Sequence, residues 1–157
     1  MRPLFLDFDG VLNSGASVLA QGRSGSPASG TYLDEVSVEL VARLTREMDL
    51  GVVFSTSWRA RGAEGLAAVL ANYGWFDVPV LGRTELRWNV DPKTSRGELI
   101  ARWLYKNTSG WDGPGDYLVI DDGDIRGHSE KCVVQTSFST GFRSQHFREA
   151  RSKLQAK

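Results

Sequence analysis

The sequence predicts an α/β fold, a three-layer sandwich with a central parallel sheet. Short apolar runs without clean polar alternation recur along the chain, and such runs are typical of strands buried on both faces. Between them lie segments whose apolar residues repeat at helical spacing. Strands that alternate with helices of this length favour a parallel sheet that is covered by helices.

Four apolar runs are the predicted strands, and they cover residues 4–6, 52–54, 117–120 and 132–135. A further short strand is expected at 78–81. It contains Pro79, which has no N–H to donate to a neighbouring strand. This strand should therefore lie at an edge of the sheet.

Four helices are predicted from apolar stripes. The first spans 34–49, and the second ends near Gly74, a residue typical of a helix C-terminus. Ser95 and Glu98 have the spacing of a capping box at the start of the third. The last helix carries Ser144 as its expected cap. The stripes comprise Val36, Leu40, Val41, Leu44 and Met48; Leu66, Val69, Leu70 and Tyr73; Leu99, Ile100, Trp103 and Leu104; and Phe147, Ala150 and Leu154.

Two segments carry no clear pattern. Residues 14–31 are rich in Gly, Ser and Ala and are expected to form a flexible loop or a minimal cap insertion. Residues 82–92 show no periodicity. Neither segment is long enough for a separate cap domain, so a single domain over 1–157 is expected.

Composition excludes several classes of protein. The chain has 157 residues, 41% of them hydrophobic, and its 19 basic and 19 acidic side chains give no net charge. This balance argues against a disordered chain and against a generally basic nucleic-acid coat. One cysteine can form neither an internal disulfide nor a four-ligand zinc site.

The apolar runs also bear on location. None approaches the roughly 20 residues that span a bilayer. The first run ends in charged residues by Asp7 and is too short for a signal peptide. A soluble, cytoplasmic protein without membrane association is expected.

Polar residues follow three of the predicted strands. The segments are Asp7-Phe8-Asp9-Gly10, Ser55-Thr56-Ser57 and Asp121-Asp122. In open α/β sheets, ligands bind beyond the carboxyl ends of the strands. Carboxylates that cluster there repel one another, and a hard divalent cation can hold them together. Ligands that are all oxygen, without His or Cys, favour Mg²⁺.

The string Asp7-Phe8-Asp9-Gly10-Val11-Leu12 after an apolar strand resembles the first motif of the haloacid dehalogenase (HAD) superfamily of phosphatases. A hydroxyl, a lysine and an acidic pair follow in the superfamily's order, over roughly 3–125. The segments 55–59 and 120–122 resemble those of small, nearly capless HAD domains found alone or beside RNA-repair modules, and 140–142 is similar to the end of that group. The resemblance implies a HAD-like, Rossmannoid fold with a minimal cap.

The resemblance also implies roles for four aspartates. Asp7 is expected to be the nucleophile that forms an aspartyl-phosphate. Asp9 is expected to protonate the leaving oxygen and then to activate water. Mg²⁺ is expected on the Asp7 carboxylate, the Asp9 main-chain carbonyl and the Asp122 carboxylate. Asp121 should lie beside them and orient waters or the lysine.

The transferring phosphoryl group needs fixed donors and a cation. Thr56 is the expected hydroxyl donor, although Ser55 and Ser57 flank it and the register is open by one residue. Ser55 and Ser57 are expected among the substrate-binding residues. Lys93 is the expected ammonium, because it precedes the capping-box helix and can lie near a helix N-terminus, where anions are favoured.

Three further residues are expected at the substrate or near it. Arg59 and Arg61 are alternative cations, and Arg59 is placed at the substrate rather than at the transferring group. Gly10 permits the tight turn after Asp9 and is grouped with the substrate-binding residues.

The resulting prediction is a Mg²⁺-dependent phosphatase whose substrate is a nucleotide or a nucleic-acid terminal phosphate. Family analogy, several arginines, and Trp58 and Trp88 as candidate stacking residues favour that substrate. A phosphotransferase, a phosphoprotein or sugar-phosphate phosphatase and a non-catalytic metal-binding module are the alternatives. So is a module that works beside a ligase or kinase. No obligate protein partner is indicated.

Overall fold

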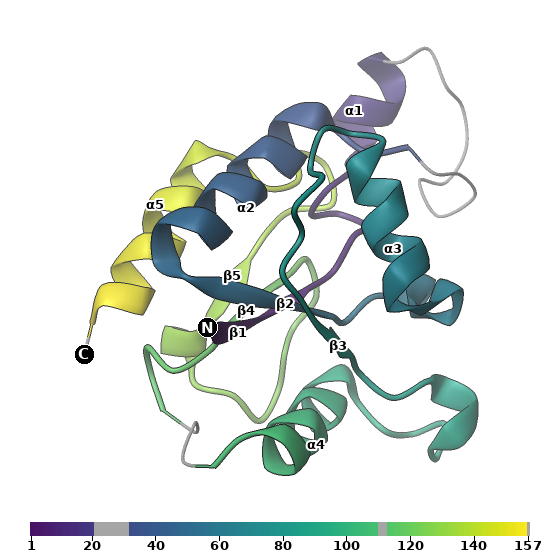
Figure 1. Ribbon diagram of the computed structural model, residues 1–157, viewed down its shortest axis with the longest axis vertical. Helices are drawn as coiled ribbons and strands as arrows, with labels where there is room; N and C mark the ends of the chain where they lie inside the picture. Colours follow the sequence, from purple (N-terminus) through teal and green to yellow (C-terminus); the bar gives the residue numbers. More distant parts are fainter. Residues whose placement is uncertain (21–31, 110–112, 157) are drawn as a thin grey trace.

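A five-stranded parallel sheet forms the centre of the molecule, in the order β3-β2-β1-β4-β5 (Figure 1). The computed structural model describes residues 1–20, 32–109 and 113–156. The strands are β1 (Arg2–Leu6), β2 (Leu50–Phe54), β3 (Val80–Arg83), β4 (Leu118–Asp121) and β5 (Val133–Gln135). The predicted α/β class with a parallel sheet is confirmed.

β3 lies at the edge of the sheet, as Pro79 predicts. The strand begins at Val80, two residues later than expected. Pro79 still contributes to the pairing, because its carbonyl accepts a hydrogen bond from the Val52 N–H at 2.7 Å. A proline can accept in this way but cannot donate, so it precedes the strand rather than lying within it.

Helices cover both faces of the sheet. α2 (Glu35–Met48), α3 (Gly62–Ala71) and α5 (Ser144–Gln155) pack on one face, where they bury Leu4 and Leu6 of β1. α4 (Arg96–Asn107) covers the other face and packs on Phe5, which points the opposite way (Figure 1). Because strand side chains alternate between faces, each buried strand serves two cores.

The helix ends show why these segments are helical. The Asp34 side chain accepts a hydrogen bond from the Val36 N–H and caps α2. Ser95 and Glu98 form the predicted capping box of α4. The expected cap of α5 is wrong by one residue. Ser144 is the first helical residue and Arg143 takes the cap position, where its N–H donates to His146 Nδ1 at 3.0 Å.

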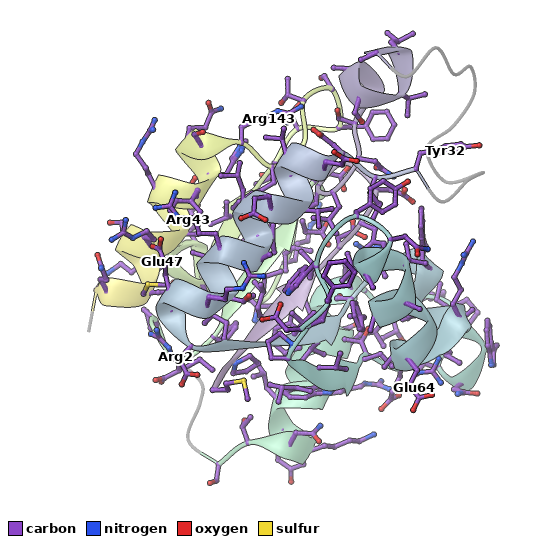
Figure 2. The ribbon with its side chains drawn as sticks, turned by 45° about the horizontal axis from the view of Figure 1, so that its top comes forward. Arg2, Tyr32, Arg43, Glu47, Glu64 and Arg143 are labelled. Carbon is purple, nitrogen blue, oxygen red and sulfur yellow. The ribbon has the colours of Figure 1, made fainter. Side chains whose placement is uncertain are left out.

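Charged side chains join α2 and α5, and Figure 2 shows Arg43 and Glu47 on α2 where it borders α5. The Arg43 guanidinium lies 5.1 Å from the ring centroid of Phe147 on α5. Glu47 pairs with Arg43 at 2.6 Å and with Arg151 of α5 at 3.6 Å. These contacts join the two helices, which pack on the same core.

Part of the expected flexible loop is a helix, α1 (Gly15–Ala20). Ser14 explains why it starts there, because the Ser17 N–H donates to Ser14 Oγ at 3.1 Å and the Ser14 N–H donates to Ser17 Oγ at 2.9 Å. The rest of the expected loop or minimal cap, residues 21–31, lies outside the described residues. The patternless segment 82–92 contains the end of β3 and a short 3₁₀ helix, η3 (Arg87–Asn89).

Among the residues that the structure describes, none of the helices has the length and apolar character to cross a membrane.

Candidate active site

Three polar residues lie side by side at the carboxyl ends of the central strands. Leu6, the last residue of β1, pairs with Phe54 at the end of β2 and with Ile120, the residue before the end of β4. The ladder continues one residue further, since the Asp7 N–H donates to the Ile120 carbonyl and the Ser55 N–H to the Leu6 carbonyl. Asp7, Ser55 and Asp121 therefore form a row, on the face of the sheet that α4 covers.

Carboxylates converge at this row. Asp7, Asp121 and Asp122 each offer one oxygen, and these oxygens lie within 4.8 Å of one another. Asp7 and Asp121 are buried, whereas Asp122 is half-buried. Like charges this close raise one another's pKa, so a cation is needed if all three are to be ionised.

Arg96, the first residue of α4, supplies positive charge at the row. Its Nη1 lies 2.8 Å from Asp7 Oδ2 and 2.6 Å from Asp121 Oδ2. The capping box fixes the start of this helix. Gly97 allows the helix to lie against the following loop, because a Cβ on Gly97 would lie 2.0 Å from the Arg126 carbonyl oxygen.

Lys93, the cation expected from the sequence, is exposed. Its main-chain N–H, not its ammonium group, donates to Asp91 Oδ1 at 2.8 Å. None of the ion pairs among the described residues involves Lys93. The structure thus brings Arg96 rather than Lys93 to the carboxylates. The role of Lys93 stays a prediction.

Burial and charge set the protonation of these groups. Burial raises the pKa of Asp7 to about 7; Arg96 opposes the rise and Asp121 adds to it. Burial and then Asp121 raise the pKa of Asp122. Although burial acts in the other direction, Asp7 and Asp121 raise the pKa of Arg96, which therefore stays charged.

Asp9 is half-buried and held in one orientation. Its Oδ1 accepts a hydrogen bond from Asn13 Nδ2 at 3.0 Å, and its Oδ2 accepts one from Trp58 Nε1 at 2.9 Å. Asn13, which no sequence pattern singled out, also accepts a hydrogen bond from the Gly10 N–H. The expectation that Trp58 could stack on a base is wrong. Its side chain is buried, and its ring centroid lies 5.3 Å from that of Phe8.

Gly10 lets the loop after β1 approach Asp122. Its φ is +77°, and a Cβ at this position would lie 2.3 Å from Asp122 Oδ2. Its carbonyl accepts a hydrogen bond from Thr136 Oγ1 at 2.7 Å, which anchors the loop. A contact of Gly10 with substrate stays a prediction.

The three candidate hydroxyls have different surroundings. Thr56 Oγ1 is buried and accepts the Trp58 N–H at 3.3 Å, capping the 3₁₀ helix η2 (Ser57–Arg61). Ser57 is exposed. Ser55 Oγ is buried without a hydrogen-bond partner among the described residues, so its hydrogen-bonding capacity is unused. Thr84 follows the edge strand β3 and lies next to Ser55. Its Oγ1 is also buried without a hydrogen-bond partner among the described residues, which the sequence does not indicate.

The expected substrate arginine, Arg59, is buried beside the row. Its Nη1 donates to the Thr56 carbonyl at 2.7 Å and its Nε to the Glu85 carbonyl at 2.9 Å. Arg61 instead lies over the Trp58 ring, 5.2 Å from its centroid.

The donor set at the row fits a hard divalent cation such as Mg²⁺. It consists of carboxylate oxygens from Asp7, Asp121 and Asp122 that lie close enough to share one ion. The missing Cβ of Gly10 is what admits the third carboxylate.

Gly10→Ala should weaken cation binding. The added Cβ must displace the Asp122 carboxylate, so we expect the Kd for Mg²⁺, measured by calorimetry, to rise by about tenfold or more. Gly74→Ala is the control, since Gly74 also has positive φ but nothing within 4 Å of its Cβ position. Unchanged binding in Gly10→Ala would remove Asp122 from the cation site.

Asp7→Asn should change how stability depends on pH in metal-free protein. The folded chain holds a proton on Asp7 up to about pH 7, whereas the unfolded chain releases it near its ordinary pKa of 3.8. As pH rises from 3.8 to about 7, the free energy of unfolding of wild type should therefore fall relative to that of Asp7→Asn, by about 1 kcal/mol per pH unit. Urea unfolding in EDTA measures this difference, and a gap that stays constant with pH would refute it.

Comparison with known proteins supports the resemblance seen in the sequence. Residues 3–147 match the family described as the HAD domain in Swiss Army Knife RNA repair proteins. Searches of curated proteins and of solved structures found no match. The matched region contains β1 to β5 and the acidic row. The chain therefore belongs to the family of HAD domains in Swiss Army Knife RNA repair proteins.

Proposed function

We propose that the protein is a Mg²⁺-dependent phosphatase that hydrolyses a phosphate monoester through an aspartyl-phosphate on Asp7. The observation that carries the proposal is the set of three carboxylates within 4.8 Å of one another, with the Arg96 guanidinium on two of them. Membership of a HAD family supports phosphatase-type chemistry and the general use of Mg²⁺.

Asp7 is the group suited to attack phosphorus. One carboxylate oxygen accepts the Phe8 N–H at 2.8 Å and the other pairs with Arg96, so the side chain is fixed. The Arg96 charge lowers the pKa of Asp7 against the effect of burial and favours the ionised nucleophile. Attack forms a bond from the Asp7 oxygen to phosphorus and breaks the bond from phosphorus to the leaving oxygen.

Asp9 is suited to move the proton. Asn13 and Trp58 orient its carboxyl group, two residues beyond the nucleophile. It would give a proton to the leaving oxygen and then take one from the water that attacks the aspartyl-phosphate. Phosphate leaves and the Asp7 carboxylate is restored.

Charge on the transferring group needs donors that are already in place. Arg96 and the unpartnered hydroxyl of Ser55 lie at the row for this purpose. A bound Mg²⁺ would be held by carboxylates of the row, Asp7, Asp121 and Asp122, with the Asp9 carbonyl as the further ligand that the family resemblance implies, and would neutralise charge on the phosphoryl oxygens.

The proposed substrate is a nucleotide or a nucleic-acid terminal phosphate. It rests on the description of the matched family and on the arginines beside the row. The proposal requires no membrane and no protein partner, and it places the enzyme in the cytoplasm.

The test is phosphate release with Mg²⁺ from an aryl phosphate, nucleoside 5′- and 3′-monophosphates, and oligonucleotides with a terminal phosphate. Asp7→Asn should lower kcat by about three orders of magnitude or more, because no nucleophile remains. Asp124→Asn is the matched control, an exposed aspartate paired with Arg126, and should retain activity. Full activity in Asp7→Asn, or no release from any substrate by folded wild type, would refute the proposal.

A further inference from the structure

A pocket of about 220 Å³ lies beside the acidic row and is lined chiefly by cationic and aromatic side chains. Among its lining residues are Arg59, Arg87, Arg96 and Trp88. Arg96 also contacts Asp7 and Asp121, so it connects the pocket directly to the row. The pocket is smaller than the roughly 300–1,000 Å³ typical of sites that enclose a whole small molecule. Its size suits one group of a larger substrate.

The positive charge of this pocket exceeds what the protein itself neutralises. Within the described ranges, no carboxylate forms an ion pair with Arg59 or Arg87. Arg59 is only 5% exposed, and its side chain donates to the main-chain carbonyls of Glu85 and Thr56. Burial lowers the pKa of Arg59, and the charges of Arg96 and Arg87 lower it further, while the charge of Asp7 opposes this only in part. A buried guanidinium without an ion-pair partner is costly, which favours the binding of an anion in the pocket.

That anion is distinct from the one at the acidic row. A phosphoryl group at Asp7 already has Arg96, Ser55 and the expected cation near it. Arg87 and the free side of Arg59 face a separate space. Planar guanidinium groups in pairs bind phosphate oxygens well.

Trp88 adds a surface for a planar ring. It lies in η3 beside Arg87 and is 71% exposed. An exposed indole next to arginines is the arrangement on which proteins stack the bases of single-stranded nucleic acid. A stacked base and a phosphate in neighbouring positions are both features of one nucleotide.

We propose that this pocket is a second phosphate subsite, which binds the phosphate next to the one attacked by Asp7. The base of the neighbouring nucleotide, which lies beyond this second phosphate, stacks on Trp88. The inference rests on the proposed function and narrows its substrate to a nucleic-acid strand with a terminal phosphate. A mononucleotide with one phosphate would leave the subsite empty.

Binding to the Asp7→Asn protein tests the subsite without turnover. The ligands are a fluorescent single-stranded oligonucleotide with a terminal phosphate, a nucleoside 3′,5′-bisphosphate and a nucleoside monophosphate. The oligonucleotide should bind about tenfold or more tightly than the monophosphate. Adding Arg87→Gln should remove most of that gain and reduce the salt dependence of binding. Adding Trp88→Ala should raise the Kd for the oligonucleotide by about tenfold.

Two matched controls lie away from the pocket. Arg126→Gln removes an exposed arginine that is paired with Asp124, and Tyr105→Ala removes an aromatic ring that is 89% exposed on α4. Both should bind the oligonucleotide as the parent does. Equal binding of oligonucleotide and monophosphate, or losses in Arg87→Gln and Trp88→Ala no larger than those of the controls, would overturn the subsite. A bisphosphate that binds as tightly as the oligonucleotide would support the phosphate subsite and overturn the stacked neighbouring base.

Turnover separates this inference from the proposed function. In otherwise wild-type protein, Arg87→Gln should lower the ratio of kcat/KM for the oligonucleotide to kcat/KM for an aryl phosphate by about tenfold. If neither substrate is hydrolysed, the proposed function fails, while the binding measurements still decide whether the subsite exists.

Discussion

The site depends on the convergence of three carboxylates at the edge of a parallel sheet, with one guanidinium to balance two of them. Strand register alone sets Asp7 beside Asp121, and both are buried. Without Arg96 their mutual repulsion would favour protonation or displacement of one of them. The capping box that starts α4 at Arg96 therefore serves the site as well as the helix.

Close packing holds this arrangement in place. Two glycines, Gly10 and Gly97, lie where a Cβ would clash with the Asp122 side chain and with the Arg126 carbonyl, so the loop after β1 lies against Asp122 and the first turn of α4 lies against the loop after β4. Below them the three central strands, β1, β2 and β4, are buried on both faces, so this part of the sheet has little room to relax. Rigid elements thus position groups that the chemistry needs at fixed distances.

Much of this could be predicted from the sequence, because apolar runs and caps act locally. Such local patterns predict the strands, the edge position of β3 and the capping box of α4. They do not predict the choice between Lys93 and Arg96, since it depends on which residue of the α4 start faces the sheet. Trp58 was misjudged for a similar reason. Its indole is buried by Phe8 and donates to Asp9, a contact 49 residues away that no local pattern reveals. The unpartnered Thr84 hydroxyl was equally invisible, because only the pairing of β3 with β2 brings it beside Ser55.

Arg96 opposes the rise that burial produces in the pKa of Asp7 and so favours the ionised nucleophile. NMR titration of the Asp7 carboxyl carbon in metal-free protein measures this directly, with Asp7→Asn to assign the signal. In Arg96→Gln the pKa of Asp7 should rise above its wild-type value, because the guanidinium that lowers it is gone. In Arg102→Gln, which alters an arginine of α4 paired with Glu85, it should not move. An Asp7 pKa that is unchanged or lower in Arg96→Gln would contradict the account.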